Sequence, residues 1–518
     1  MTSMPRRVLG IDVGTTGVRA AIVDELGRIL AEAGEPCAPQ MPARGRAEID
    51  PEAWWNAVRS VLARLADREP LGATEAVGVV GQAPTAILID SAGRALRPAI
   101  LWLDVRAADE AGALDAALGP GRAHSLGGNR MHPYYLGPKI AWLRTHEPDV
   151  LDRAAALVQS HAFVAMRLTG EARCDLSTAM LSSPMFDMNA RQWSAEGARA
   201  VGIGVSLLPP IVRAHDVIGG VTRDAARLLG LRQGTPVVAG GGDFAASALG
   251  AGVIEEGQAC LMLGTAGNLL MPLNEPRFDD RLVNSHHVGC ERWLALGGTL
   301  CGAAFEWFRG VFGPDVDFET MERDAAELGS GGGGVILLPY FCGERTPVWD
   351  EDARGVFFGI DLTHKRAHLY RALVEGVALG FRDSLSLAEQ RGTRFSELVA
   401  VDGAGKSALL RQTLSDALGL PLTWIEGGGG TLIGAAALAA LGTGILPGAQ
   451  RTREWRLRAE RGVDGRSGAV RHLPRERQRA ALSRVSALRT EIYGALKQTF
   501  RSAAAADGDR AVGSASDA

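Results

Sequence analysis

The sequence predicts an α/β protein made of two related domains, and three observations support this. Its 518 residues exceed what one domain ordinarily holds, since about 150 residues per domain is usual. Segments with strand patterns are followed by segments with helix patterns, as in α/β folds. A strand, a Gly/Thr turn and a second strand occur near residue 10 and again near residue 258. This recurrence, about half a chain apart, indicates two copies of one fold facing each other.

Composition excludes several classes of protein. Apolar residues make up 46% and charged residues 22%, which is ordinary for a globular chain. The 55 basic and 59 acidic side chains leave a net charge of −4, so neither nucleic acid nor an anionic membrane is an expected partner. No apolar stretch reaches the roughly 18 residues of a membrane span, and no signal peptide is recognisable. Six scattered cysteines without a Cys-x-x-Cys pair favour the reducing cytoplasm.

The opening segments have the pattern of a strand hairpin followed by a capped helix. Apolar residues alternate on both sides of the turn Gly14-Thr15-Thr16-Gly17, which predicts strands over residues 8–13 and 18–24. Asp50 before Pro51 is typical of a helix start, because aspartate accepts unpaired N–H groups and proline suits the first turn. Further strands are expected over residues 28–33, 76–82, 86–90 and 98–102.

The stretch from Asp12 to Thr16 is a candidate phosphate site. Gly14 lets the backbone approach a ligand, and the hydroxyls of Thr15 and Thr16 with the turn amides offer donors to phosphate oxygens. Asp12, near the end of a strand, is suited to holding hydrated Mg²⁺ that accompanies the phosphates. An ordinary hairpin with turn-forming Gly and Thr is the alternative. A second Gly/Thr turn, Gly264-Thr265, lies between two strand patterns in the later half.

A predicted strand over residues 236–239 ends in Gly240-Gly241-Gly242-Asp243 and is followed by a helix pattern over 244–251. An aspartate at this point can simply cap the helix, and from the residues alone a cap is favoured. A carboxylate at the mouth of a strand can instead accept a hydroxyl proton in phosphoryl transfer. The three glycines suggest room for a ligand there.

The loop from Asp402 to Ser407 follows a predicted strand over 398–401 and opens a helix over 408–418. Small residues and free amides at a helix start suit the phosphate or sugar of a nucleotide. The first glycine of a Walker A loop is absent, so a P-loop is rejected. A plain strand–turn–helix junction is the alternative.

In their order along the chain, these stretches resemble the FGGY carbohydrate kinases, nearest the xylulokinase-like branch, from about residue 7 to 446. Other stretches that match are residues 97–107, Leu263 to Gly267, and Gly343 to Trp349. The resemblance implies two ribonuclease-H-like domains of the actin/hexokinase superfamily, with the active site in the cleft between them. It also implies an ATP-dependent kinase with Mg²⁺. Carried over residue by residue, it assigns Asp243 as the catalytic base and gives the ATP phosphates to Asp12, Gly14, Thr15, Thr16, Gly264 and Thr265. The adenosine loop falls on Gly403, Ala404 and Gly405.

The sugar is expected in the first domain. Candidate ligands beside Asp243 are Gln82, Asp104, Arg106 and Tyr134, because their polar groups lie near strand ends. One departure concerns the substrate: this chain has Gln82-Ala83-Pro84-Thr85 where xylulokinases usually carry Gln-Met-His-Gly. Since Ala and Pro offer no side-chain donor, D-xylulose is not expected to be the best substrate.

The expected organisation is an N-terminal domain over 1–250 and a C-terminal domain over 251–450. A C-terminal extension over 451–500 and a disordered tail over 501–518 follow. Within the extension, residues 451–470 are rich in arginine and glycine without periodicity, and residues 474–500 have the spacing of a helix. The partners are a small sugar and ATP, and a homodimer is an open alternative to a monomer. Two other functions stay open: a kinase for another substrate of the family, such as a polyol, glycerol or an aldonate, and a non-catalytic sugar- or ATP-binding regulator.

Overall fold

The computed structural model describes residues 5–425, 430–461 and 469–513. By its contacts the chain divides into two compact units. Unit 1 takes in residues 1–256, 272–295 and 427–468, and unit 2 takes in 257–271, 296–426 and 469–518.

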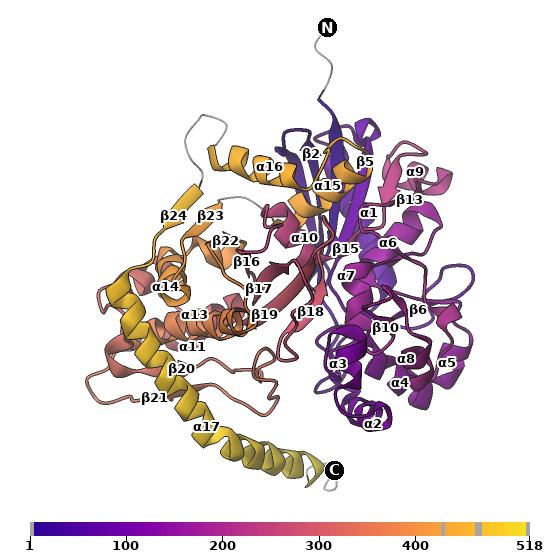
Figure 1. Ribbon diagram of the computed structural model, residues 1–518. Helices are drawn as coiled ribbons and strands as arrows, with labels where there is room; N and C mark the ends of the chain where they lie inside the picture. The colour runs from indigo at the N-terminus through magenta and orange to yellow at the C-terminus, as the bar shows by residue number, and fades with distance from the viewer. Residues whose placement is uncertain (1–4, 426–429, 462–468, 514–518) are drawn as a thin grey trace. The chain divides into compact units, whose positions relative to one another are not determined.

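The core of unit 1 is a mixed sheet in the order β13-β14-β5-β1-β2-β3, with β15 also paired to β5 (Figure 1). Its strands are β1 (Arg7–Val13), β2 (Gly17–Asp24), β3 (Ile29–Pro36), β5 (Ala76–Gly81), β13 (Val217–Gly220), β14 (Pro236–Val238) and β15 (Gly241–Gly242). Strands β1, β2 and β3 form an antiparallel meander, whereas β5 is parallel to β1, β14 and β15. The predicted opening hairpin is confirmed.

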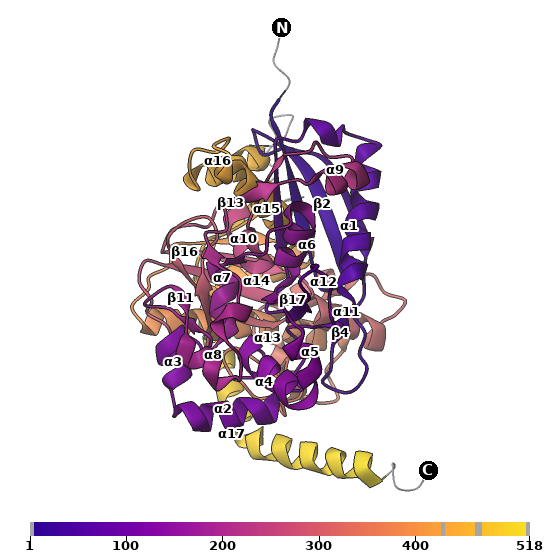
Figure 2. The same ribbon diagram turned by 90° about the vertical axis from the view of Figure 1, so that its right-hand side faces the viewer.

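Helices cover both faces of this sheet, with α1 (Pro51–Ala66) on one face and α15 (Gly430–Gly442) on the other (Figure 2). The helices packed on it or beside it are α1 (Pro51–Ala66), α6 (Ser160–Thr169), α10 (Asp243–Gly250) and α15 (Gly430–Gly442). Side chains alternate along a strand, so Ile11 of β1 packs in one cluster with Trp54 of α1. On the other face, Gly10 lies against α15, where a Cβ would come within 2.6 Å of the Leu432 carbonyl oxygen. The predicted cap of α1 is confirmed, because Asp50 accepts from its second residue.

A second hydrophobic cluster of unit 1 lies among shorter elements. These elements are β6 (Ile87–Ile89), β7 (Ala99–Ile100), β8 (Ala156–Val158), α2 (Ala108–Leu118), α4 (Leu136–His146), α5 (Pro148–Asp152) and α8 (Ala195–Ala200). Unit 1 also contains β4 (Glu48–Ile49), which pairs with β7, and α3 (Arg122–Gly127). The remaining elements of unit 1 are β9 (Cys174–Asp175), α7 (Leu176–Ala179), β10 (Phe186–Asp187), β11 (Gln192–Trp193), β12 (Ile211–Val212), α9 (Arg223–Leu229), β18 (Val283–His286) and α16 (Gln450–Arg461).

Unit 2 contains a sheet with the same strand order. Its strands run β19-β17-β16-β22-β23-β24. They are β16 (Gln258–Leu263), β17 (Ala266–Leu273), β19 (Trp293–Leu300), β22 (Glu397–Val401), β23 (Leu422–Ile425) and β24 (Ala469–His472). Strand β17 is antiparallel to β16, the strands β16, β22 and β23 are parallel, and β24 closes the order antiparallel, as β13 does in unit 1. The predicted α/β class with two related domains is therefore confirmed.

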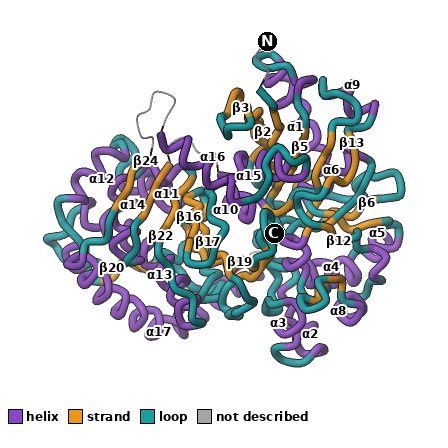
Figure 3. The backbone as a smooth tube through the Cα atoms, turned by 45° about the horizontal axis from the view of Figure 1, so that its top comes forward, coloured by secondary structure: helices purple, strands orange, loops and turns teal. Residues whose placement is uncertain are grey.

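The helices of unit 2 pack around this sheet, and α14 lies on α13 and β23 (Figure 3). The remaining elements are α11 (Gly302–Phe312), α12 (Phe318–Ala326), α13 (Arg366–Gln390), α14 (Ala408–Leu418), α17 (Glu476–Gly513) and the hairpin β20 (Ile336–Leu338) with β21 (Val356–Phe358). Buried Arg489 attaches α17 by donating to the Tyr340 hydroxyl at 3.2 Å and pairing with Asp383 at 2.9 Å. Among the described residues, no helix is long and apolar enough to cross a membrane.

The structure differs from the expected organisation of the later chain. Helix α15 falls within the predicted 251–450 domain but packs on the unit 1 sheet, because glycines of β1 and β5 face it. The boundaries at 250 and 450 stay a prediction.

Two C-terminal expectations also differ. Helix α16 occupies part of the segment 451–470, which shows no periodicity in sequence, and it is attached by Trp455, whose indole donates to the Glu25 carbonyl at 3.2 Å. Helix α17 continues through Gly513 where a disordered tail was expected, since the run of alanines after Ser502 favours helix. Residues 462–468 and 514–518 lie outside the described chain.

We expect Gly78→Ala to destabilise unit 1. A Cβ on Gly78 would lie 2.1 Å from the Ala435 carbonyl oxygen of α15, and overpacking of this kind costs about 1–3 kcal/mol or more. Gly112→Ala is the matched control, because no atom lies within 4 Å of its Cβ in α2. Thermal melting should show a lower Tm for Gly78→Ala and an equal or higher Tm for Gly112→Ala. Equal melting of the two variants would contradict the close packing of α15.

Candidate active site

Three of the predicted site residues lie at or just after the ends of neighbouring strands in unit 1. The last residue of β1 and Gly242 of β15 both lie opposite Gly81, the last residue of β5. Asp12 near the end of β1, Gln82 after β5 and Asp243 after β15 therefore lie at one edge of the sheet. Ligands of open α/β sheets bind at this carboxyl edge.

Asp12 is a buried carboxylate with one oxygen paired and the other unpaired. Arg19, opposite on β2, donates to Oδ2 at 2.7 Å. Oδ1 is buried and has no hydrogen-bond partner among the described residues. Burial raises the pKa of Asp12, and the charge of Arg19 opposes that shift. An unpaired carboxylate oxygen fits hydrated Mg²⁺, which proteins hold through one or two carboxylates together with substrate phosphates.

The turn between β1 and β2 presents threonine hydroxyls. The Gly14 amide donates to the Gly17 carbonyl at 2.9 Å and closes the turn, leaving Thr16 exposed and Thr15 partly exposed. The indole Nε1 of Trp102 donates to Thr15 Oγ1 at 3.0 Å. Because Thr15 Oγ1 accepts a hydrogen bond from the indole N–H, the Thr15 hydroxyl can donate its own proton to another acceptor.

The corresponding turn of unit 2 is built against a helix start. Gly264 and Thr265 connect β16 to β17, and their carbonyls accept from the amides of Cys301, Gly302 and Ala303, where α11 begins. A Cβ on Gly302 would lie 2.8 Å from the Gly264 carbonyl oxygen. Neither Cys301 nor Gly302 was predicted from the sequence to belong to the site. The signal that could have found them is Gly302, a glycine between a strand pattern and a helix pattern.

The loop after β22 lies next to the second turn, because β22 is parallel to β16 and Val401 lies opposite Met262. Residues Gly403–Lys406 form a 3₁₀ turn, and Ser407 caps α14 by accepting from the Leu410 amide at 3.0 Å. The buried guanidinium of Arg411 donates to the Gly405 carbonyl at 2.6 Å, which holds the turn. No atom lies within 4 Å of a Cβ built on Gly403.

Asp243 is the first residue of α10, and it does not serve as the cap. The cap residue is Gly242, which has no side chain to offer. Oδ1 of Asp243 accepts from the adjacent Phe244 amide at 2.6 Å. The helix-cap alternative for Asp243 is therefore wrong.

The expectation that the three glycines leave room for a ligand is also wrong. A Cβ on Gly240 would lie 1.7 Å from the Val79 carbonyl oxygen, and one on Gly241 would lie 2.9 Å from an oxygen of Asp175. A Cβ on Gly242 would meet the ring of Phe244 at 2.4 Å. The glycines instead let the protein pack closely around the residue before Asp243.

Gln82 and Tyr134 remain candidate sugar ligands. Gln82 is 1% exposed, and neither polar atom of its side-chain amide has a hydrogen-bond partner among the described residues. Its backbone is held by bonds to Val13 and Ser160. Tyr134 is buried, and its hydroxyl donates to the Ala83 carbonyl at 3.4 Å while its ring meets the edge of Trp102.

Asp104 and Arg106 are used by the protein itself, which corrects their assignment as sugar ligands. Asp104 is fully buried and accepts from the Ala47 amide at 2.6 Å and from the Arg106 guanidinium at 2.6–3.0 Å. Arg106 also pairs with Glu48 at 2.7 Å. These bonds attach the segment after β7 to β4, and we do not carry the pair forward as sugar ligands.

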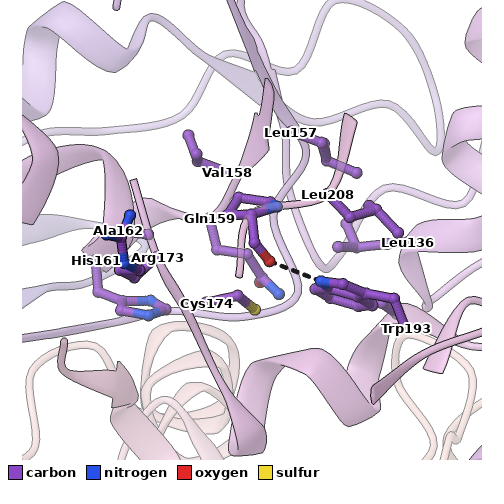
Figure 4. Close-up of a pocket in the computed structure, with 12 residues that line it drawn as sticks. Leu136, Leu157, Val158, Gln159, His161, Ala162, Arg173, Cys174, Trp193 and Leu208 are labelled. Carbon is purple, nitrogen blue, oxygen red and sulfur yellow. Dashed lines mark hydrogen bonds between the residues drawn. The ribbon is translucent and has the colours of Figure 1, made fainter. Parts of the chain in front are cut away.

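A small cavity of unit 1 lies among residues of α4, β8, α6 and β9 (Figure 4). Its volume is about 10 Å³, room for one water molecule. The Trp193 indole beside it donates to the Pro209 carbonyl at 2.6 Å. A cavity of this size is too small to hold a sugar.

Comparison with known proteins shows the family. Residues 7–250 match the N-terminal domain, and residues 259–443 the C-terminal domain, of the FGGY family of carbohydrate kinases. The chain belongs to the FGGY family. It is therefore an ATP-dependent carbohydrate kinase.

Several relatives carry the name xylulose kinase. The Escherichia coli enzyme of that name is 32% identical over 439 residues, which are 84% of this chain and 89% of the relative. A solved structure titled xylulose kinase from Rhodospirillum rubrum is 30% identical with a TM-score of 0.86, covering 96% of this chain and all of that chain. A Bacillus subtilis gluconokinase is 26% identical over 86% of this chain and 89% of its own length.

The FGGY kinase also contains polar residues near Asp243 that the sequence analysis missed. Asp175, Ser177 and Thr178 lie beside Gly241 and Gly242 in unit 1. Their signal is an Asp-x-Ser-Thr stretch, which is typical of a helix start.

We expect Asp104→Ala to destabilise the kinase by about 1–3 kcal/mol or more, because it removes the acceptor of the Ala47 amide and leaves Arg106 with Glu48 as its remaining carboxylate partner. Gln82→Leu is the matched variant, and its free energy of unfolding should change little, since the amide has no bond to lose. Denaturant unfolding measures both. An Asp104→Ala protein as stable as the parent but with a raised KM for sugar would restore Asp104 as a ligand.

Proposed function

We propose that this kinase transfers the γ-phosphate of ATP to a hydroxyl of a ketopentose or a related sugar or polyol, with Asp243 as the general base. The observation that carries the proposal is the position of Asp12, Gln82 and Asp243 at or just after the ends of neighbouring strands, on one edge of the sheet. The names of the relatives, which are xylulose kinases and a gluconokinase, support a sugar or a related compound as the substrate.

The proposed step is an in-line phosphoryl transfer. The acceptor hydroxyl oxygen forms a bond to the γ-phosphorus while the bond to the β,γ-bridging oxygen breaks and ADP leaves. The hydroxyl proton passes to the carboxylate of Asp243. Asp243 is the first residue of α10, which places its carboxylate at the end of the sheet edge described above.

The two Gly/Thr turns are proposed to bind phosphate oxygens through backbone amides and threonine hydroxyls. Mg²⁺ bound with ATP neutralises phosphate charge, and Asp12 would hold it through water with its unpaired Oδ1. The residues assigned to phosphates and metal are Asp12, Gly14, Thr15, Thr16, Gly264 and Thr265.

The adenosine of ATP is proposed to lie on the turn of Gly403, Ala404 and Gly405. The open space at Gly403 and the bonds from Arg411 support this assignment, because they combine access with a fixed backbone.

A sugar and ATP are the proposed partners of this kinase, and the cytoplasm is its proposed location. The nearly balanced net charge of −4 gives no reason to expect a nucleic-acid partner.

The sugar is proposed to be read by Gln82 and Tyr134 beside Asp243. Ala83 and Pro84 offer no side-chain donor, and the Ala83 carbonyl accepts from Tyr134. The nearby His132 accepts a hydrogen bond at Nδ1 from the Tyr134 amide at 3.1 Å. These observations favour a substrate whose hydroxyl pattern differs from that of D-xylulose, with a polyol or an aldonate as the second candidate.

We expect Asp243→Asn to fold and bind sugar but to lose turnover by at least about 10²–10⁴-fold, the usual contribution of a positioned acid–base group. Asp224→Asn is the matched control, an exposed aspartate in the first turn of α9. A coupled assay of ADP release measures kcat. Near-normal turnover of Asp243→Asn would refute the base.

We expect D-xylulose not to lead a substrate panel, since losing a buried donor typically costs about 1–3 kcal/mol, roughly tenfold to hundredfold in kcat/KM. The panel comprises D-xylulose, its stereoisomers, four- and five-carbon polyols and gluconate. Should D-xylulose exceed every other compound by more than about tenfold, the inference from Ala83 and Pro84 is wrong.

A further inference from the structure

The carboxylate of Asp175 is buried next to Gly241 in unit 1 and accepts several hydrogen bonds. Asp175, at the end of β9, is 1% exposed. Its Oδ2 accepts from the amide and the hydroxyl of Ser177 at 2.7 and 2.5 Å, and its Oδ1 accepts from the hydroxyl of Thr178 at 2.5 Å. His161 of α6 places Nε2 3.4 Å from Oδ1. Nothing in the proposed reaction uses this carboxylate directly.

These partners keep Asp175 ionised. Burial by itself would raise the pKa of Asp175, but His161 and the hydroxyls of Ser177 and Thr178 hold it below its ordinary value. An ionised carboxylate only accepts hydrogen bonds, so the hydroxyl proton of Ser177 is committed to Asp175. The lone pairs of Ser177 Oγ are then directed away from Asp175.

Ser177 uses that orientation to hold the residue before Asp243. Its Oγ accepts from the Gly242 amide at 3.1 Å, and a Cβ on Gly241 would lie 3.1 Å from the same oxygen. The Ser177 backbone is held in turn, because the Ser285 hydroxyl donates to its carbonyl at 2.8 Å. On its other side, Gly242 is paired with β5 at Gly81. The backbone leading into Asp243 is thus fixed from two directions.

We propose that Asp175 and Ser177 are positioning residues for Asp243, acting through the Gly242 amide to aim the carboxylate at the acceptor hydroxyl. The inference rests on the proposed role of Asp243 as base. It also explains the glycines: side chains at 241 and 242 would separate the loop from Ser177 and from the packing around α10. The fixed backbone reduces the number of orientations that the Asp243 carboxylate can adopt.

Ser177→Ala removes the acceptor of the Gly242 amide and tests the proposal. A misplacement of about 1 Å in a catalytic group costs up to about 10²-fold, so kcat should fall about tenfold to a hundredfold. Because sugar and ATP do not contact Ser177 in the proposed site, both KM values should stay within about twofold. Thr178→Val is the matched control: it removes a hydroxyl bond to the same carboxylate but leaves the bond from Gly242 to Ser177, so its kcat should stay near that of the parent.

A double-mutant cycle separates positioning from general loss of structure. In an Asp243→Asn background, measured at high enzyme concentration, Ser177→Ala should cause no further loss of kcat, since its effect passes through Asp243. An equal fold-loss in both backgrounds would overturn the proposal, as would equal kcat for Ser177→Ala and Thr178→Val. Proportionate increases in KM would overturn it too, by indicating a binding role.

Ser177→Cys provides a second variant if Ser177→Ala does not fold. It keeps most of the side-chain volume but offers sulfur, a weak acceptor, to the Gly242 amide. A reduced kcat supports the proposal and a kcat equal to the parent overturns it. An inactive Asp243→Asn beside a fully active Ser177 variant refutes positioning alone, whereas an active Asp243→Asn refutes the proposed base and the positioning with it.

Discussion

The candidate site depends on one strand that is hydrogen-bonded on both sides. Strand β5 pairs in parallel with β1 along one edge and with β14 and β15 along the other, so that three chain segments end beside Gly81. Asp12, Gln82 and Asp243 come from distant parts of the sequence, and this pairing alone brings them to one edge. Gly240, in the loop before α10, lets that backbone approach the Val79 carbonyl of β5, whereas Gly10 and Gly78 let α15 pack closely on β1 and β5.

The same arrangement occurs a second time with other chemistry. In unit 2, the parallel pair β16 and β22 places the turn at Gly264 beside the loop at Gly403. Unit 1 contributes carboxylates at its strand ends, whereas unit 2 contributes turns with open backbone and small residues. As proposed, one fold supplies the acid–base and metal groups in one copy and nucleotide contacts in the other. A duplicated fold can divide its tasks in this way because loops at strand ends change without changing the sheet.

Sequence patterns predicted well where a residue acts on its close neighbours. The Asp50 cap, the β1–β2 hairpin and helix α14 all depend on residues a few positions apart, and each was confirmed. The patterns misled where a residue acts on a distant segment. The three glycines before Asp243 were interpreted as ligand space, although Val79 and Asp175 occupy that space. Asp104 and Arg106 were taken as sugar ligands, although Ala47 and Glu48 bind them.

The sequence by itself determined the class of fold, its duplication, the family and the order of the site motifs, because alternation, turn chemistry and motif order are local properties. It also supplied Asp12, Gln82 and Asp243 as candidates. Only the tertiary structure decided which polar groups stay unpaired. Within the part of the chain that the structure describes, the side-chain amide of Gln82 and one oxygen of Asp12 are buried without hydrogen-bond partners, while both oxygens of Asp104 accept hydrogen bonds. Pairing is decided by segments far apart along the chain, such as Ser177 and Gly242, and no local pattern records which of them meet.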